Sequence, residues 1–186
     1  MEFNFDWIKH ISSIHSVGNE QVKALFRWAS VCDGNAVEIG SYLGRSTVVI
    51  AAGLAIGSKG SVFSIDPHIS KASNYELFLE NIENSLFVNH IIPVRNPSEK
   101  VLRNRSIHRI FRHPIGLLFI DGDHTYEGVK KDLEWVDVVY RGGIIALHDY
   151  TSKFPGIVKA VNEYQASHHT MEQYQLLGSM ILFKRL

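Results

Sequence analysis

The chain has 186 residues, and its 19 lysine and arginine residues balance 19 aspartate and glutamate residues, which gives a formal net charge of zero. A neutral balance supplies no long-range field to attract nucleic acid or an anionic membrane, so neither is an expected partner. Hydrophobic residues make up 45% of the sequence and charged residues 20%, values that exclude the disordered and fibrous classes and suit one domain over residues 1–186.

Short apolar runs alternate with longer amphipathic stretches along the chain. A short apolar run bounded by turn residues is typical of a buried strand, whereas apolar residues spaced three or four apart are typical of a helix. In chain order the pattern predicts a helix over residues 19–31 capped by Asn19, a strand over 36–39, a helix over 46–56, a strand over 61–65, a helix over 75–86, a strand over 90–94, a short helix over 98–102, a strand over 115–120, a helix over 127–140, a turn at 141–143, a strand over 144–147, a helix over 155–165, and a hairpin of strands over 174–177 and 180–183.

Strand–helix units in this order predict a parallel sheet with helices on both faces, an α/β fold of the Rossmann-like, three-layer α/β/α kind. The tight hairpin at residues 178–179 adds an antiparallel strand, where a dinucleotide-binding Rossmann sheet would continue with another parallel unit. Pro93 has no N–H to donate, so its strand belongs at a sheet edge. We expect N-terminal helices in residues 1–34 and the Rossmann-like core in residues 35–186.

The cysteine content and the first residues of the chain indicate a cytoplasmic protein. Cys32 is the only cysteine, which excludes an intramolecular disulfide and a cysteine-rich metal site. The first residues carry acidic rather than basic side chains, and no long apolar stretch follows them. We therefore expect neither a signal peptide nor a membrane span.

Two glycines follow the first predicted strand in the segment EIGSYLG over residues 38–44. Gly40 and Gly44 permit a tight turn and a close approach of the backbone to a ligand, and the next helix points its N–H groups at the same place. The spacing differs from the G-x-G-x-x-G of dinucleotide sites and from a P-loop. Glu38 suits a cationic or hydroxyl-bearing ligand better than a diphosphate. The alternative is an ordinary strand–turn–helix corner.

Asp66 ends the second predicted strand. A carboxylate at this point can accept hydrogen bonds from both ribose hydroxyls of a nucleoside. The alternative is a turn or helix-capping aspartate before Pro67.

Acidic residues and histidines follow the fourth and fifth predicted strands. Asp121, Asp123 and His124 come directly after the fourth strand, and His148 and Asp149 come after the fifth. Because these strands are neighbours in the expected sheet, their ends place the side chains in one cleft. Carboxylates that lie close together are costly unless they are protonated or paired with a cation, which makes a divalent metal one solution. The alternative is that they cap helices or form hydrogen bonds within their loops.

Taken together, these motifs resemble the class I S-adenosylmethionine (SAM)-dependent methyltransferases. The Glu-x-Gly-x-x-x-Gly loop and Asp66 carry the first part of the resemblance. Segments 117–129 and 142–150 are similar to the small-molecule O-methyltransferase branch, which includes macrocin and cephalosporin-cluster enzymes of methyltransferase family 24. The resemblance covers roughly residues 35–183, and it implies a seven-stranded, mostly parallel sheet in the order 3-2-1-4-5-7-6 with one antiparallel strand.

The resemblance also implies roles for residues at matching positions. Segment 95–98 would border the adenine of SAM, and a divalent metal, Mg²⁺ or Mn²⁺, would be bound by Asp121, His148 and Asp149. His148 departs from the family pattern, which has an acid there, and imidazole suits Mn²⁺ better than Mg²⁺. The alternatives are a softer metal, a metal held by the two aspartates and water, and no metal. The residues expected to bind SAM are Glu38, Gly40, Ser41, Tyr42, Gly44, Ser46, Asp66, His68 and Asp121.

The family chemistry implies which side chains are catalytic. A hydroxyl acceptor is a poor nucleophile near neutral pH, so a metal or a base must help to remove its proton. We expect His148, Asp149 and His124 to be catalytic, with His148 as a metal ligand or base and His124 as the other polar group of the cleft. Tyr126 and Tyr150 either line the acceptor pocket or pack as aromatic side chains.

The expected function is SAM-dependent methyl transfer to a hydroxyl of a small molecule, a sugar or secondary metabolite, with assistance from a divalent metal. One alternative is a non-catalytic protein that binds SAM or a partner. The other is an NAD-dependent oxidoreductase, which the missing G-x-G-x-x-G disfavours. A homodimer is one way to complete the acceptor pocket.

Two further groups of residues have ordinary explanations. His168 and His169 are adjacent and point apart, so we expect an exposed loop rather than a metal pair. A solvated surface rather than an anion site is expected for the basic group Arg103, Arg105, His108, Arg109 and Arg112.

Overall fold

A computed structural model describes residues 2–12, 17–57, 60–69, 71–104 and 114–186. Its helices are α1 (Asn19–Val31), α2 (Arg45–Ile56), α3 (Ala72–Glu83), α4 (Ser98–Arg103), α6 (Tyr126–Asp132) and α7 (Pro155–His168), with 3-10 helices over Phe5–Ile8, Val88–His90 and Leu133–Val138. Its strands are β1 (Asn35–Ile39), β2 (Val62–Ile65), β3 (Ile91–Val94), β4 (Ile115–Ile120), β5 (Val139–Leu147), β6 (Met171–Leu177) and β7 (Met180–Arg185).

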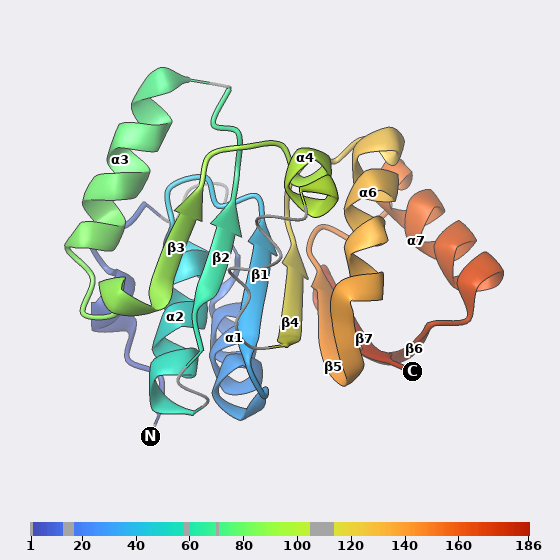
Figure 1. The fold of residues 1–186 in the computed structure, drawn as a ribbon, viewed down its shortest axis with the longest axis horizontal. Helices are drawn as coiled ribbons and strands as arrows, with labels where there is room; N and C mark the ends of the chain where they lie inside the picture. The colour runs from blue at the N-terminus through green and yellow to red at the C-terminus, as the bar shows by residue number, and fades with distance from the viewer. Residues whose placement is uncertain (1, 13–16, 58–59, 70, 105–113) are drawn as a thin grey trace.

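Within the described residues the strands form one seven-stranded sheet in the order β3-β2-β1-β4-β5-β7-β6 (Figure 1). The neighbours from β3 to β5 are parallel, and β7 runs antiparallel to both β5 and β6. The expected fold class, strand order and antiparallel strand are therefore confirmed. Pro93 lies in β3 at the sheet edge, as expected.

Apolar side chains cover both faces of the sheet. Successive residues of a strand point to opposite faces, so Leu117 of β4 belongs to the core beneath α1 and α2, whereas Leu118 belongs to the core beneath α6 and α7. Helices α1, α2 and α3 cover one face, and α4, α6 and α7 cover the other (Figure 1). No helix among the described residues is long and apolar enough to cross a membrane.

Some predicted elements have other ends in the structure, such as α3, which was expected over residues 75–86 and spans Ala72–Glu83, and β6, which was expected over 174–177 and spans Met171–Leu177. Two predicted segments differ in kind. The helix expected over residues 127–140 is α-helical only to Asp132 and continues as a 3-10 helix. The turn expected at 141–143 lies within β5 instead, because extra residues bulge out of the ladder between β5 and β4. Gly142 permits this bulge by adopting a φ of +94°. A glycine pair fits a bulge as well as a turn, which is why the sequence pattern was ambiguous here.

The start of α1 also differs from the expectation. Asn19 is the first residue of the helix rather than its cap, and Gly18 occupies the cap position. The side-chain oxygen Oε1 of Gln21 accepts a hydrogen bond from the Gly18 N–H at 3.0 Å. Gln21 lies in the first turn of α1, at the end of the helix nearest the carboxyl edge of the sheet. Its amide nitrogen also donates a hydrogen bond to the carbonyl oxygen of Leu177.

Candidate functional site

The loop between β1 and α2 turns sharply at the carboxyl edge of the sheet. Gly40 and Gly44 adopt left-handed φ angles of +87° and +88°. A Cβ atom on Gly40 would lie 2.2 Å from the carbonyl oxygen of Asp121, so this contact admits no side chain. Tyr42 also has a left-handed φ of +46°, which is uncommon outside glycine. The loop is therefore held tightly against the end of β4.

Asp66 fastens this loop to the end of β2. Its Oδ2 accepts hydrogen bonds from the N–H groups of Ser41 and Tyr42, each at 3.0 Å, and its Oδ1 accepts one from the His68 N–H at 2.7 Å. Lys71 occupies the cap position of α3, so Asp66 is a turn aspartate rather than a helix cap. The same carboxylate lines a cavity on the far side of the loop.

Glu38 lies beneath the loop rather than facing a ligand. Its side chain is fully buried, and its carboxyl group accepts hydrogen bonds from the hydroxyls of Thr47 and Ser64. Burial raises the pKa of Glu38 to about 7, against the opposing effect of these hydroxyls. Glu38 borders neither of the two cavities described below, so its position does not fit the direct contact with a cationic or hydroxyl-bearing ligand that the sequence suggested. Its contacts support the loop and the start of α2 instead.

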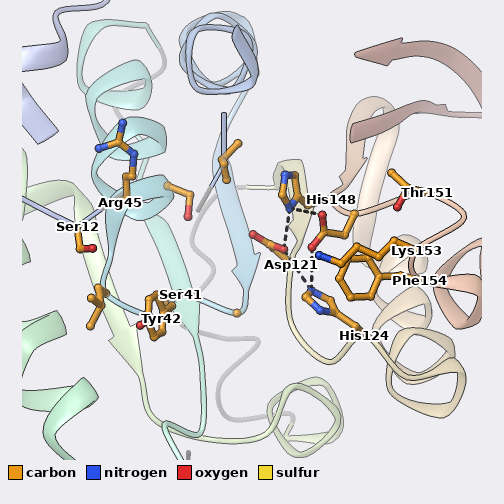
Figure 2. Close-up of a pocket in the computed structure, with 15 residues that line it drawn as sticks. Ser12, Ser41, Tyr42, Arg45, Asp121, His124, His148, Thr151, Lys153 and Phe154 are labelled. Carbon is orange, nitrogen blue, oxygen red and sulfur yellow. Dashed lines mark hydrogen bonds and ion pairs between the residues drawn. The ribbon is translucent and has the colours of Figure 1, made fainter. Parts of the chain in front are cut away.

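Two cavities flank the loop. The first has a volume of about 720 Å³. The loop and the start of α2 form one of its sides, and the residues at the ends of β4 and β5 form the other (Figure 2). The second, of about 650 Å³, lies between Asp66 and the residues that follow β3 and β4. Of the residues expected to bind or react, the first cavity is lined by Gly40, Ser41, Tyr42, Ser46, Asp121, His124, His148 and Asp149. Gly40, Tyr42 and Asp121 border both cavities.

The ends of β4 and β5 bring together two carboxylates and two imidazoles. Nδ1 of His148 lies 3.2 Å from Oδ1 of Asp121 and 3.5 Å from Oδ1 of Asp149. Nε2 of His124 lies 3.7 Å from Oδ1 of Asp121 and 3.5 Å from Oδ2 of Asp149. Figure 2 shows the side chains of Asp121, His124 and His148 pointing toward one another at the wall of the cavity. Of the described residues, Asp121, His148 and Asp149 offer ligand atoms within 4.8 Å of one another, a spacing that fits a metal ion.

The carboxylates make both imidazoles more basic. Burial opposes protonation of His148, but its hydrogen bond to Asp121 and the charges of Asp121 and Asp149 outweigh burial and raise its pKa. The pKa of His124 is also raised, mainly by its interaction with Asp121. A positive charge at this point, on a proton or on a metal ion, is therefore favoured.

Other residues that the sequence singled out lie away from this cluster. Asp123 accepts hydrogen bonds from the N–H and the hydroxyl of Thr125 and lines only the second cavity. His68 is buried against the rings of Tyr75 and Phe78 and borders neither cavity. The Tyr126 and Tyr150 hydroxyls donate to Glu163 and Asn162 of α7, and neither tyrosine lines the first cavity.

The histidine pair and the basic group do not add to the site. His168 ends α7 and stacks on Tyr164, while His169 follows it with a left-handed φ, and both are exposed. They therefore end a helix rather than forming the loop that we expected. Arg103 is exposed at the end of α4. The remaining basic residues, Arg105, His108, Arg109 and Arg112, lie outside the described residues.

Sequence reasoning missed Gln21, whose Oε1 lies 3.2 Å from Nε2 of His148. Its only signal was a polar residue on the apolar face that Val22 and Leu25 define in α1. The cavity residues Arg45, Lys153 and Phe154 were also missed, because each follows a recognised motif without belonging to it.

Comparisons with known proteins match the chain to a domain family and to solved structures of the same fold. The model of a family described as a methyltransferase domain matches residues 37–150. The O-methyltransferase TomG of tomaymycin synthesis from Streptomyces achromogenes, in complex with SAM, has a TM-score of 0.76 at 13% identity, with 100% of this chain and 92% of that chain covered. An O-methyltransferase from Bacillus cereus in complex with SAH has a TM-score of 0.71 at 18% identity, with 95% and 85% covered. CalS11, a TDP-rhamnose 3'-O-methyltransferase of calicheamicin biosynthesis, has a TM-score of 0.68 at 18% identity, with 89% and 77% covered. At these identities the likeness establishes the fold.

The contact between the loop and β4 predicts unequal costs for two glycine substitutions. Gly40→Ala and Gly142→Ala both place a side chain at a left-handed φ, which costs about 1–2 kcal/mol. Only Gly40→Ala also meets backbone, since the nearest atom to a Cβ at Gly142 is 4.0 Å away. Urea denaturation should show the larger loss of unfolding free energy for Gly40→Ala, and equal losses would contradict the close contact.

Burial of Glu38 predicts a pH-dependent stability that Glu38→Gln removes. Between its ordinary pKa of 4.5 and its folded value of about 7, the unfolded chain releases this proton while the folded chain keeps it. The unfolding free energy should therefore fall as pH rises through this window, by an amount on the order of 3 kcal/mol from this group. Urea denaturation at pH 5 and pH 8 should show Glu38→Gln gaining stability relative to the wild-type protein. A difference independent of pH would disprove the assignment.

Proposed function

Because the chain belongs to the methyltransferase domain family that its residues 37–150 match, we propose that it transfers the methyl group of SAM to a hydroxyl of a small molecule. We propose further that Asp121, His148 and Asp149 hold a divalent cation, Mg²⁺ or Mn²⁺, beside that hydroxyl. One observation carries the proposal: the glycine loop and the carboxylate–imidazole cluster border the same cavity. A methyl donor on one wall and an activated acceptor on the other need such a shared space.

The residues around the loop fit SAM. Gly40 leaves the backbone without a side chain at the cavity, whereas Gly44 borders neither cavity and packs against Phe78 and Ile82. The buried hydroxyl oxygen of Ser41 has no hydrogen-bond partner among the described residues. Ser41, Tyr42 and Ser46 would lie against the methionine part. Asp66 would hold the ribose in the second cavity, and Pro97 and Ser98 would border the adenine. Bound SAM supplies a methyl group on a sulfonium, which is already activated for transfer.

If Asp66 binds the ribose, its carboxylate both holds the loop and binds the cofactor. Its carboxylate already accepts hydrogen bonds from the backbone of Ser41, Tyr42 and His68. A carboxylate has about four lone-pair sites in all, so ribose hydroxyls would share it with the loop. Cofactor binding and the position of the loop would thus depend on the same side chain.

The cluster fits a cation by its donor set. Two carboxylates and an imidazole nitrogen converge within 4.8 Å, and the two carboxylates repel each other unless a positive charge lies between them. A bound divalent cation supplies the charge that lowers the pKa of the acceptor hydroxyl. His124 is the more exposed imidazole, and its Nε2 takes the proton from the hydroxyl group that receives the methyl group. The nearby carboxylates of Asp121 and Asp149 stabilise the resulting imidazolium.

The acceptor side of the first cavity suits a hydroxylated molecule such as a sugar or secondary metabolite. Thr151 and Lys153 offer hydrogen-bond donors, and the ring of Phe154, whose centroid is 4.6 Å from that of His124, offers an apolar surface. CalS11, which shares the fold, methylates a nucleotide-linked sugar according to its name. A small molecule is favoured over nucleic acid because the chain has no net positive charge.

The proposal predicts separate effects for Asp66→Ala and Asp149→Asn in isothermal titration calorimetry. Asp66→Ala should weaken SAH binding about tenfold or more, since hydrogen bonds to a charged group contribute roughly 1.5–3 kcal/mol. Asp149→Asn should leave SAH affinity unchanged and abolish the heat of Mn²⁺ binding. Asparagine suits this position because Asp149 has a left-handed φ of +55°. Equal loss of SAH binding in both variants would contradict the separation of the two sites.

Catalysis is tested with SAM and a panel of nucleotide sugars, free sugars and phenols, with SAH release as the readout. We expect one acceptor class to give SAH release that EDTA removes and Mn²⁺ or Mg²⁺ restores. Absence of SAH and SAM binding, with EDTA or with metal, would overturn the proposed function.

A further inference from the structure

Gln21 of α1 connects the N-terminal helix to the carboxylate–imidazole cluster. Its side chain is only 8% exposed. Its Oε1 accepts a hydrogen bond from the Gly18 N–H at 3.0 Å and lies 3.2 Å from Nε2 of His148. Its Nε2 donates to the carbonyl oxygen of Leu177 and to Oγ of Ser179, each at 3.0 Å. Both ends of the amide are therefore engaged.

These contacts fix which way the amide faces. The Leu177 carbonyl can only accept a hydrogen bond, and the Gly18 N–H can only donate one. A flipped amide would place oxygen against the carbonyl and nitrogen against the N–H, and both bonds would be lost. The oxygen of Gln21 must therefore be the atom that faces His148.

The amide in turn fixes the tautomer of His148. Because Oε1 of Gln21 is an acceptor, Nε2 of His148 must carry a hydrogen to bond with it. The competing arrangement, donation from the Ser179 hydroxyl to Nε2, has a longer separation of 3.4 Å and would set two acceptor lone pairs against each other at 3.2 Å. In the neutral ring, Nδ1 then carries the lone pair.

That lone pair faces two carboxylate oxygens. Nδ1 of His148 lies 3.2 Å from Oδ1 of Asp121 and 3.5 Å from Oδ1 of Asp149. Three acceptors at these distances repel one another unless a proton or a cation lies among them. Histidines that ligate metals commonly donate their other ring N–H to a carbonyl or carboxylate group, which holds the ring and its tautomer in place.

We propose that Gln21 is a positioning residue that locks His148 as the Nε2–H tautomer, so that Nδ1 is presented to a divalent cation shared with Asp121 and Asp149. The cation, and the tautomer that it favours by replacing a proton beside Nδ1, both rest on the proposed function. Gln21 acts from outside residues 37–150, the part of the chain that matches the family. The N-terminal helix thereby becomes part of the reaction centre.

The tautomer is tested by long-range ¹H–¹⁵N correlation spectra of protein saturated with Mg²⁺, a diamagnetic cation that would take the place of a proton between Nδ1 and the two carboxylates. The signals of His148 are identified by their loss in His148→Gln. We expect the Nε2–H form in the wild-type protein. Gln21→Met, which keeps the size of the side chain but has no oxygen, should let the ring leave the cation in part of the population and so give a second set of His148 signals. Gln21→Glu, which keeps an acceptor toward His148, should restore the Nε2–H form.

The same variants are titrated with Mn²⁺ by calorimetry. Gln21→Met should weaken Mn²⁺ binding about 10–100-fold, the usual effect of removing a hydrogen-bond partner behind a metal ligand. Gln21→Glu should stay within a few-fold of the wild-type affinity. Both variants lose the donors to Leu177 and Ser179, so a merely structural role would weaken both alike. Ser179→Ala is the matched control, which should leave the tautomer and Mn²⁺ binding unchanged, and SAH affinity and thermal unfolding report whether each variant is folded.

The two measurements separate the possible failures. A single, unchanged set of His148 signals in Mg²⁺-saturated Gln21→Met would overturn the positioning role of Gln21, and an Nδ1–H form in the wild-type protein would overturn the tautomer. Equal loss of Mn²⁺ binding in Gln21→Met and Gln21→Glu would also overturn it. Absence of Mn²⁺ and Mg²⁺ binding by the folded wild-type protein would overturn the cation, both here and in the proposed function, whereas SAH binding by the same protein would still support the methyl donor.

Discussion

The arrangement of the site depends on one contact, in which Gly40 packs directly against the backbone of Asp121 because it has no side chain. It joins the end of β1 to the end of β4, where the Asp121 N–H also bonds to the carbonyl oxygen of Ile39 at 2.8 Å. Because no Cβ separates the two segments, the loop that leads into α2 and the polar side chains after β4 and β5 border one cavity. Methyl transfer requires donor and acceptor to be aligned within such a space.

Buried polar side chains support this arrangement from behind. Glu38 lies under the loop against Thr47 and Ser64, and Gln21 lies behind His148. Neither points into the cavity, yet each has hydrogen bonds that would be lost if the loop or the imidazole moved. Since an unsatisfied buried polar group is costly, these contacts favour one position of the groups that line the cavity.

The order of elements was predictable because hydrophobic periodicity reflects burial directly. The run at residues 115–120 became β4 at those bounds, since a short, continuous apolar run is typical of a strand covered on both faces. The ends of α3 and β5 were less predictable. Gly142 and Gly143 satisfy a turn or a bulge equally well, and only the pairing of β5 with β4 decides between them.

By itself the sequence determined which residue types follow each strand, and the topology of a parallel sheet then required Gly40, Asp66, Asp121 and His148 to meet at one edge. It did not determine where the side chains point. Asp121 and Asp123 are two residues apart, but one joins the cluster and the other bonds to Thr125. The direction of a polar side chain depends on partners that come from distant elements, and for His148 one of these, Gln21, is 127 residues away in the sequence. Periodicity carries information about burial along one element, whereas such pairings exist only once the elements have packed.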